Sequence, residues 1–147
     1  MILLNTSTQL APLADLHSDL VRRGIMVVDD SSMHRYSANA CLRALGIQQV
    51  YEAADGQSAL DQLARITPAP ALMLLDLEMP VMDGIEVLQH LANSSSQPAV
   101  VLASSSNEML LGAVVTMAEA LGIKLLGAFR KPVDPRDLAG ALAAYQA

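Results

Sequence analysis

The sequence predicts an α/β fold in which helices cover both faces of a doubly wound, five-stranded parallel sheet. From Ile25 onward, short apolar runs rich in β-branched residues alternate with longer segments whose apolar residues recur at helical spacing. Strands and helices that alternate in this way are typical of parallel sheets. The strand runs are mostly apolar along their whole length, which indicates that both faces of the sheet are buried.

The strands and helices can be assigned in chain order from these patterns. The five strand candidates cover residues 25–29, 48–51, 71–75, 99–103 and 124–128. The five helix candidates cover residues 32–45, 56–66, 84–93, 107–121 and 135–145. Several of these helices begin at a capping residue or a proline, and Gly46 and Gly122 follow the ends of two of them, as expected at helix C-termini.

A further region precedes this pattern. Leu10, Leu13, Leu16 and Leu20 recur at helical spacing, which favours an extra amphipathic helix packed on the domain or on a second copy of the chain. A leader without regular structure explains the same residues equally well. We therefore divide the chain into residues 1–23, a leader or extra helix, and residues 24–147, one folded domain.

The composition excludes several classes of protein. With 52% hydrophobic and 16% charged residues the chain is too apolar to be disordered, yet no apolar run reaches the roughly 20 residues of a membrane helix. The net charge of −6 and the scattered Lys and Arg residues argue against direct binding of nucleic acid. Cys41 is the only cysteine and the N-terminus lacks the features of a secretory signal, so we expect a cytoplasmic protein.

The chemistry is expected at the carboxyl ends of the strands, where open parallel sheets bind their ligands. Three carboxylates, a hydroxyl and an ammonium group follow four of the predicted strands: Asp29 and Asp30, Asp76, Ser104, and Lys131. Neighbouring carboxylates repel one another unless a cation lies between them. Each residue alone could be an ordinary turn or capping residue, but complementary groups at four strand ends favour a functional site.

Magnesium suits such a site, since Mg²⁺ binds through one or two carboxylates and takes its remaining oxygens from water and phosphate. We expect Asp30 and Asp76 to bind the ion directly, with Asp29 supporting them. Asp76 could then act as a nucleophile toward phosphorus. Lys131 and the hydroxyl of Ser104 would balance the charge on the phosphoryl oxygens during transfer.

Four stretches resemble the receiver domains of bacterial response regulators: MVVDDSSMHR from Met26, YEAADGQSAL from Tyr51, LMLLDLEMPVMDGIEVL from Leu72 and FRKPVD from Phe129. The third stretch is the most specific. It places Pro80 four residues and Gly84 eight residues after Asp76, as in the receiver signature D-x-x-M-P-x-M-D-G. The resemblance covers about residues 24 to 146.

The resemblance implies a flavodoxin-like sheet with the strand order 2-1-3-4-5 and a phosphoacceptor of a two-component system. Asp76 would be phosphorylated by a sensor histidine kinase or a phosphotransfer protein. Asp29 and Asp30 would be the acidic pair, with Asp30 a direct Mg²⁺ ligand and the backbone carbonyl of Glu78 a further ligand. Lys131 would contact the phosphoryl group, and the peptide bond that joins it to Pro132 would be cis.

The same resemblance implies a signalling protein and not an enzyme that turns over a metabolite. Phosphorylation would shift a protein-binding or dimer surface, and the chain would catalyse at most its own slow dephosphorylation. The stretch MAEALGIKLLGAFRKPV, from Met117, is similar to receivers that precede EAL-type cyclic di-GMP phosphodiesterase domains. A homodimer and a downstream EAL-type output domain are both compatible with this resemblance.

Two positions depart from the receiver pattern. A switch hydroxyl is expected after the fourth strand, and the sequence VVLASSSN offers Ala103, Ser104 or Ser105 according to the register; we favour Ser104. The aromatic residue common three positions before the lysine is replaced by Ala128, and Phe129 should face the opposite side of the strand. A receiver that acts purely as an interaction module, with an inert acidic site, is therefore the alternative.

Two other classes of protein fit the motifs less well. Phosphatases of the haloacid dehalogenase kind also form an aspartyl phosphate after a parallel strand, but Glu78 stands where they carry a second aspartate. A flavodoxin-type cofactor carrier needs a phosphate-binding loop where Asp29 and Asp30 would repel phosphate unless a metal intervened. We expect Cys41 to be an inert, buried thiol. The histidines are expected on helix surfaces: His17, His34 and His90.

Overall fold

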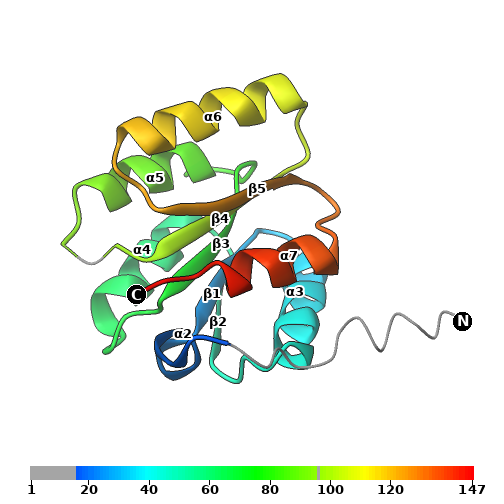
Figure 1. Cartoon of the computed structure of the whole chain (residues 1–147). Coiled ribbons are helices and arrows are strands. Elements are labelled where there is room, and N and C mark those ends of the chain that lie inside the picture. The colour runs from blue at the N-terminus through cyan, green and yellow to red at the C-terminus, as the bar shows by residue number, and fades with distance from the viewer. Residues whose placement is uncertain (1–15, 96) are drawn as a thin grey trace, which may run out of the picture.

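The computed structural model describes residues 16–95 and 97–147. A five-stranded parallel sheet with the strand order β2-β1-β3-β4-β5 forms its centre, which confirms the predicted fold class (Figure 1). The strands are β1 Ile25–Val28, β2 Val50–Ala53, β3 Leu72–Asp76, β4 Ala99–Ser104 and β5 Leu125–Arg130. The order reverses between β1 and β3, so the carboxyl ends of these two strands form the point where this fold binds ligands.

Helices cover both faces of the sheet. They are α2 Ser18–Arg23, α3 Ser32–Ala44, α4 Gly56–Arg65, α5 Gly84–Ala92, α6 Glu108–Ala120 and α7 Pro135–Ala143. Figure 1 shows α4, α5 and α6 on one face and α3 and α7 on the other, while the short α2 lies near the edge where β1 begins.

The helices begin where side chains satisfy their free backbone N–H groups. Ser31, Asp55, Asp83 and Asn107 each accept a hydrogen bond from the backbone three residues ahead, at the start of α3, α4, α5 and α6 respectively. The glycines that were predicted to follow two helices both have positive φ, 113° at Gly46 and 79° at Gly122. The local signals for these helix ends are therefore confirmed.

Two hydrophobic clusters hold the layers together. One lies under α4, α5 and α6 and contains Met26, Met73, Leu75 and Leu102 from the strands. The other lies under α3 and α7 and contains alternate residues of the same strands. Strand residues therefore face the two clusters in turn, and every residue of β1, β3 and β4 is buried, as expected for strands covered on both faces.

Several strand boundaries differ from the sequence prediction. β2 begins at Val50 and not at residue 48, because its pairing with β1 starts where Val50 lies opposite Ile25. β3 ends with Asp76, paired with Ala103, and β4 continues through Ser104. Asp76 and Ser104 are therefore the last residues of their strands and not the residues after them.

The N-terminal prediction can be assessed in part. Leu20 lies in α2 and is fully buried in the cluster under α3 and α7, and Leu16 packs against the same cluster. Part of the segment 1–23 is therefore a helix packed on the domain. Leu10 and Leu13, on which the longer predicted helix also depended, lie outside the described residues.

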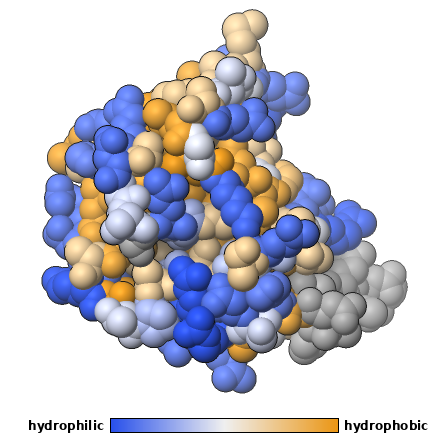
Figure 2. Space-filling model, turned by 60° about the vertical axis from the view of Figure 1, so that its left-hand side comes forward, coloured by the Kyte–Doolittle hydropathy of each residue, from blue (hydrophilic) through white to orange (hydrophobic). Residues whose placement is uncertain are grey.

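The surface mixes polar and apolar residues. Figure 2, in which the left-hand side of Figure 1 is brought forward, shows hydrophobic residues between groups of hydrophilic ones. Within residues 16–95 and 97–147, none of the helices has both the length and the apolar character needed to span a bilayer.

Candidate functional site

Three carboxylates meet at the carboxyl ends of β1 and β3. Asp29 and Asp30 follow β1, and Asp76 ends β3, which pairs with β1 up to Val28 and Leu75. Oxygen atoms of the three side chains lie within 4.8 Å of one another. Asp76 is 3% exposed and Asp29 is also buried, while Asp30 is exposed. The predicted acidic residues are thus brought together, with access from solvent on the side of Asp30.

Lys131 reaches the same cluster from the end of β5, the edge strand of the sheet. It follows β5, and its backbone N–H donates to the Ser104 carbonyl at 2.8 Å. Its Nζ lies 2.9 Å from Asp29 Oδ2 and 3.1 Å from Asp76 Oδ1. The Lys131–Pro132 peptide bond is cis, as predicted. One ammonium group therefore bridges two of the three carboxylates.

The charges in this cluster do not balance. Burial, followed by repulsion from Asp29, raises the pKa of Asp76 from 3.8 to about 6, against the opposing effect of Lys131. Burial also opposes the charge on Lys131, but its hydrogen bonds and charge interactions with Asp29 and Asp76 outweigh that effect and raise its pKa. Three carboxylates against one ammonium leave a surplus of negative charge in a partly buried place.

The surplus and the ligand type fit a hard divalent cation. Carboxylate oxygens at this spacing are the donors that Mg²⁺ uses, and the exposed position of Asp30 allows the ion to keep some of its waters. Asp29, Asp30 and Asp76 are the residues that would hold it. A cation at this position would also offset the repulsion that raises the pKa of Asp76.

The loop after Asp76 is tightly constrained, which explains the signature residues. A Cβ atom at Gly84 would lie 2.6 Å from the Asp76 carbonyl oxygen and 2.8 Å from Leu77 Cα, so only glycine fits there. Val81 has φ 69° and is 98% exposed, a strained conformation for a β-branched residue. The Glu78 N–H donates to Asp76 Oδ1 at 3.1 Å. The loop therefore returns closely to Asp76.

Ser104, the favoured switch hydroxyl, ends β4 and is fully buried. Its Oγ donates to Glu78 Oε2 at 2.6 Å and accepts from the Ser106 N–H at 3.0 Å. The hydroxyl is therefore engaged by Glu78 and not by the acidic cluster. Ala103 and Ser105, the two alternatives in the register, both line a cavity that also contains Asp76 and Lys131.

That cavity lies between α3 and α7 and has a volume of about 450 Å³. Its deeper wall is apolar and includes Val27, Leu74 and Leu138. Cys41 also lines it and is half-buried, so the prediction of a buried thiol was wrong. Partial burial raises the pKa of the thiol, which disfavours the reactive thiolate.

Two contributors were not anticipated from the sequence. His34 is exposed on α3, as predicted for the histidines, but its ring Nδ1 also lies 3.4 Å from Lys131 Nζ and 3.4 Å from Asp29 Oδ2, which was not anticipated. Its place in the first turn of α3, beside the strand end that bears Asp29, was the available signal. The side chain of Glu78 also holds the loop after β4, a contact that spans 26 residues and carries no local signal.

Ala128 and Phe129 face opposite sides of β5, as predicted from strand alternation. Ala128 packs against the cluster under α4, α5 and α6, and Phe129 packs against the opposite cluster. Phe129 therefore faces away from the position that an aromatic residue at 128 would take.

Comparison with known proteins agrees with this geometry. The family model described as response regulator receiver domain matches residues 25–143. The cyclic di-GMP phosphodiesterase RocR of Pseudomonas aeruginosa is 30% identical over 123 residues, which cover 84% of this chain and 31% of that protein. The chain thus spans about a third of the length of this curated relative.

Solved structures share the fold. The chemotaxis protein CheY4 of Vibrio cholerae matches with a TM-score of 0.67 and 25% identity over 80% of this chain and 93% of that one. The bacteriophytochrome response regulator AtBRR matches with a TM-score of 0.66 and 30% identity over 85% of this chain and 95% of that one. The chain belongs to the family of response regulator receiver domains.

Proposed function

We propose that Asp76 accepts a phosphoryl group from a phosphohistidine of a sensor kinase or a phosphotransfer protein, in a reaction that depends on Mg²⁺. The observation that carries this proposal is the buried carboxylate of Asp76, raised in pKa to about 6 and flanked by Asp29, Asp30 and Lys131. A purely structural carboxylate would be expected to have balancing partners. This one has a surplus of like charge, which suits a metal-dependent nucleophile.

The chemical step needs little from the protein besides position and charge. A lone pair on a carboxylate oxygen of Asp76 forms the bond to phosphorus, and the bond from phosphorus to the donor's imidazole nitrogen breaks with its electron pair going to that nitrogen. Lys131 and the Glu78 N–H already lie within 3.1 Å of Asp76 Oδ1, where charge changes during the step. They hold the carboxylate in place and offset the negative charge of the phosphoryl oxygens.

Asp29, Asp30 and the backbone carbonyl of Glu78 are the groups that we propose, with Asp76, to hold Mg²⁺. When bound, the ion would neutralise the carboxylates and the phosphoryl oxygens, so that two anions can approach each other. Asp30 is exposed and can therefore exchange the ion with solvent, whereas the buried Asp29 is fixed by Lys131 at 2.9 Å.

The phosphorylated chain would act in the cytoplasm through other proteins, by a shifted protein-binding or dimer surface. RocR, with which the chain shares 30% identity, is named a cyclic di-GMP phosphodiesterase, so an EAL-type output domain on the same polypeptide is one outlet for this switch. The receiver itself would catalyse at most slow loss of its own phosphoryl group.

A second candidate function is an interaction module that works without phosphorylation. The hydrogen bond from Ser104 to Glu78 and the small side chain of Ala128 favour it, because both depart from the usual arrangement of a switch. The two functions differ in one property, the reactivity of Asp76.

Intact-mass analysis after incubation with phosphoramidate and Mg²⁺ tests the choice. We expect the chain to gain the mass of one phosphoryl group, to lose it in hydroxylamine, and to gain none with chelator or as Asp76→Asn. Asp61→Asn, which changes an exposed carboxylate on α4, is the matched control and should label normally. Equal labelling of Asp76→Asn and the unchanged chain would rule out the proposal.

A further inference from the structure

The cavity between α3 and α7 is present because small side chains face it. Those of Ser37, Ala38 and Cys41 line it from α3, which begins beside the acidic site. Toward the other end of the helix, Leu42 and the C-cap residue Leu45 are fully buried in the cluster under α3 and α7. Large side chains therefore fill this layer away from the acidic site, while the end beside that site is left hollow.

This cavity has the character of a site for a small organic molecule. Its volume of about 450 Å³ lies within the range of such sites, roughly 300 to 1,000 Å³. Val27, Leu74 and Leu138 form a buried apolar wall. The buried carboxylates of Asp29 and Asp76 also line the cavity. An apolar wall with a few convergent polar groups is the usual form of a ligand pocket.

The charged side chains that line the cavity leave a negative surplus. The carboxylates of Asp29 and Asp76 share one ammonium group, that of Lys131, whose Nζ lies 2.9 Å from Asp29 Oδ2 and 3.1 Å from Asp76 Oδ1. Within residues 16–95 and 97–147, Asp76 Oδ2 receives no hydrogen bond, although Asp76 is only 3% exposed. A cationic donor in the cavity would therefore meet both an excess of negative charge and an acceptor with free lone pairs.

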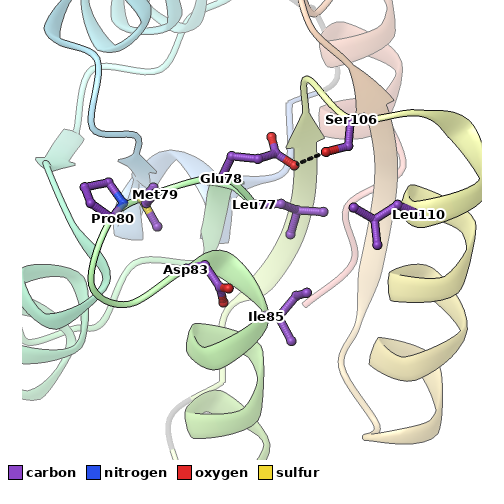
Figure 3. A pocket seen from close by; sticks show the side chains of 8 residues that line it. All are labelled: Leu77, Glu78, Met79, Pro80, Asp83, Ile85, Ser106 and Leu110. Carbon is purple, nitrogen blue, oxygen red and sulfur yellow. Dashed lines mark hydrogen bonds between the residues drawn. The ribbon is translucent and has the colours of Figure 1, made fainter.

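A second cavity, of about 380 Å³, differs in this respect (Figure 3). Its carboxylates, Glu78 and Asp83, are only half-buried, and Asp83 caps α5. Oε2 of Glu78 accepts from the hydroxyls of Ser104 and Ser106, and Oε1 accepts from the N–H and hydroxyl of Ser105. These four bonds occupy the roughly four lone-pair positions of the Glu78 carboxylate, so it has no acceptor left for a ligand.

We infer that the cavity between α3 and α7 binds a small organic amine, with its apolar body against the buried wall and its ammonium group against Asp29 and Asp76. Such a ligand would use the negative charge that we assign to Mg²⁺, so the amine and the ion should each weaken the binding of the other. An amine in the cavity would thereby hold the chain in its unphosphorylated form. Only this antagonism rests on the proposed function, because the binding of the amine does not require phosphorylation.

The test measures the binding of tryptamine to the full, metal-free chain at neutral pH. The chain contains no tryptophan, so the fluorescence anisotropy of the indole ring reports the ligand alone. We expect half-saturation below about 1 mM, in keeping with a ligand of this size. Tryptophol, in which a hydroxyl replaces the ammonium group, should bind about tenfold more weakly. Indole-3-propionate, which carries a carboxylate, should bind more weakly still.

A substitution at the acidic site tests the role of charge. Asp29→Asn should weaken tryptamine binding by about tenfold and leave the affinity for tryptophol nearly unchanged. The comparison of two ligands in one variant separates the loss of charge from a distorted site, which would weaken both. Asp61→Asn, on the exposed surface of α4, is the matched control and should preserve the ratio of the two affinities.

Two further measurements locate the ligand. Ala38→Leu would fill the cavity from α3 and should weaken both tryptamine and tryptophol by at least about tenfold. Ala40→Leu, exposed on the same helix, is its control and should bind like the unchanged chain. In the unchanged chain, tryptamine should slow the alkylation of Cys41, the only cysteine, by iodoacetamide. At ten times the half-saturating concentration the reaction should be about tenfold slower, because about a tenth of the chains are then unoccupied.

Each contrary result has a distinct meaning. Equal affinity for tryptamine and tryptophol, or no binding of tryptamine, would overturn the inference of an amine site. Unslowed alkylation of Cys41 with tryptamine bound would overturn its location. A tryptamine affinity that is the same with saturating Mg²⁺ would overturn the antagonism. None of the metal-free measurements involves phosphorylation of Asp76, so the inference and the proposed function can fail separately.

Discussion

Two polar clusters, at opposite ends of the parallel strands, each contain an aspartate in a different electrostatic environment. At the edge where β1 begins, Asp19 pairs with Arg22 at 2.8 Å and with Arg23 at 3.0 Å, and it accepts from the Tyr145 hydroxyl at 2.7 Å. At the other edge, Asp76 shares Lys131 with Asp29 and lies beside Asp30. The first cluster has two arginines for one carboxylate, and the second has one lysine for three carboxylates.

The pKa values follow this difference in sign. The Tyr145 hydrogen bond, aided by the arginines, lowers the pKa of Asp19 despite its partial burial. Burial and the charge of Asp29 raise the pKa of Asp76 to about 6. The Asp19 cluster joins α2 to Tyr145 and stabilises the fold, whereas the Asp76 cluster disfavours the ionised form of its buried carboxylate.

The largest effect is expected from Gly84→Ala. The added Cβ would lie 2.6 Å from the Asp76 carbonyl oxygen, and backbone must move to admit it. We expect a loss of about 3 kcal/mol in the free energy of unfolding, measured in urea. Gly112→Ala, where nothing lies within 4 Å of the new atom, is the control and should not destabilise α6. If Gly84→Ala left the free energy of unfolding as unchanged as Gly112→Ala does, the loop would not confine Asp76.

The next prediction compares one substitution at the two edges. At pH 7 without metal, Asp76→Asn should raise the free energy of unfolding by about 2 kcal/mol, because it removes a carboxylate whose ionisation the fold disfavours. Asp19→Asn should lower it by about 1 kcal/mol, because two ion pairs are lost. Denaturant titrations of both variants measure this, and changes of the same sign would remove the distinction between the clusters.

The pH dependence should show the same contrast. Asp76 has a folded pKa of about 6 against 3.8, so the folded chain holds the extra proton and its stability falls as the pH rises through that window. Thermal unfolding without metal should therefore occur at a lower temperature at pH 7 than at pH 4.5. Mg²⁺ should raise the midpoint more at pH 7 than at pH 4.5, since it binds the ionised carboxylates. The fall should be absent in Asp76→Asn; its persistence there would assign it to other groups.

The smallest effect is expected from Val81→Gly. Val81 has φ 69° at a fully open surface position, a conformation that glycine adopts without strain. We expect a gain of up to about 1 kcal/mol, since relief of the strain exceeds the added entropy of the unfolded glycine. Val21→Gly, within α2, should instead destabilise the chain. A destabilised Val81→Gly would mean that the valine side chain makes a contact worth more than its strain.

The sequence allowed much of this architecture to be predicted. Apolar runs and capping residues located the strands and helices, and the rule that parallel strands end at one edge brought together Asp29, Asp76 and Lys131. The predicted start of β2 at residue 48 was wrong. A strand boundary depends on the neighbouring strand, and β2 starts only where Val50 pairs with Ile25 of β1.

The contacts of Glu78 and His34 could not be predicted for a related reason. Glu78 meets Ser104 across 26 residues, and His34 meets Lys131 across 97. Such contacts depend on how far long side chains extend between loops, and periodicity and capping signals describe only neighbours along the chain. The acidic site was thus predictable from strand ends, and the loop that surrounds it was not.

The most direct test of the account is to map the phosphoryl group itself. After phosphorylation with phosphoramidate and Mg²⁺, borohydride reduction converts an aspartyl phosphate to homoserine, and peptide sequencing by mass spectrometry locates it. We predict homoserine at position 76 and aspartate retained at Asp29 and Asp30. Homoserine at either of those two positions, or none in any peptide despite bound Mg²⁺, would contradict the assignment of Asp76 as the phosphoacceptor.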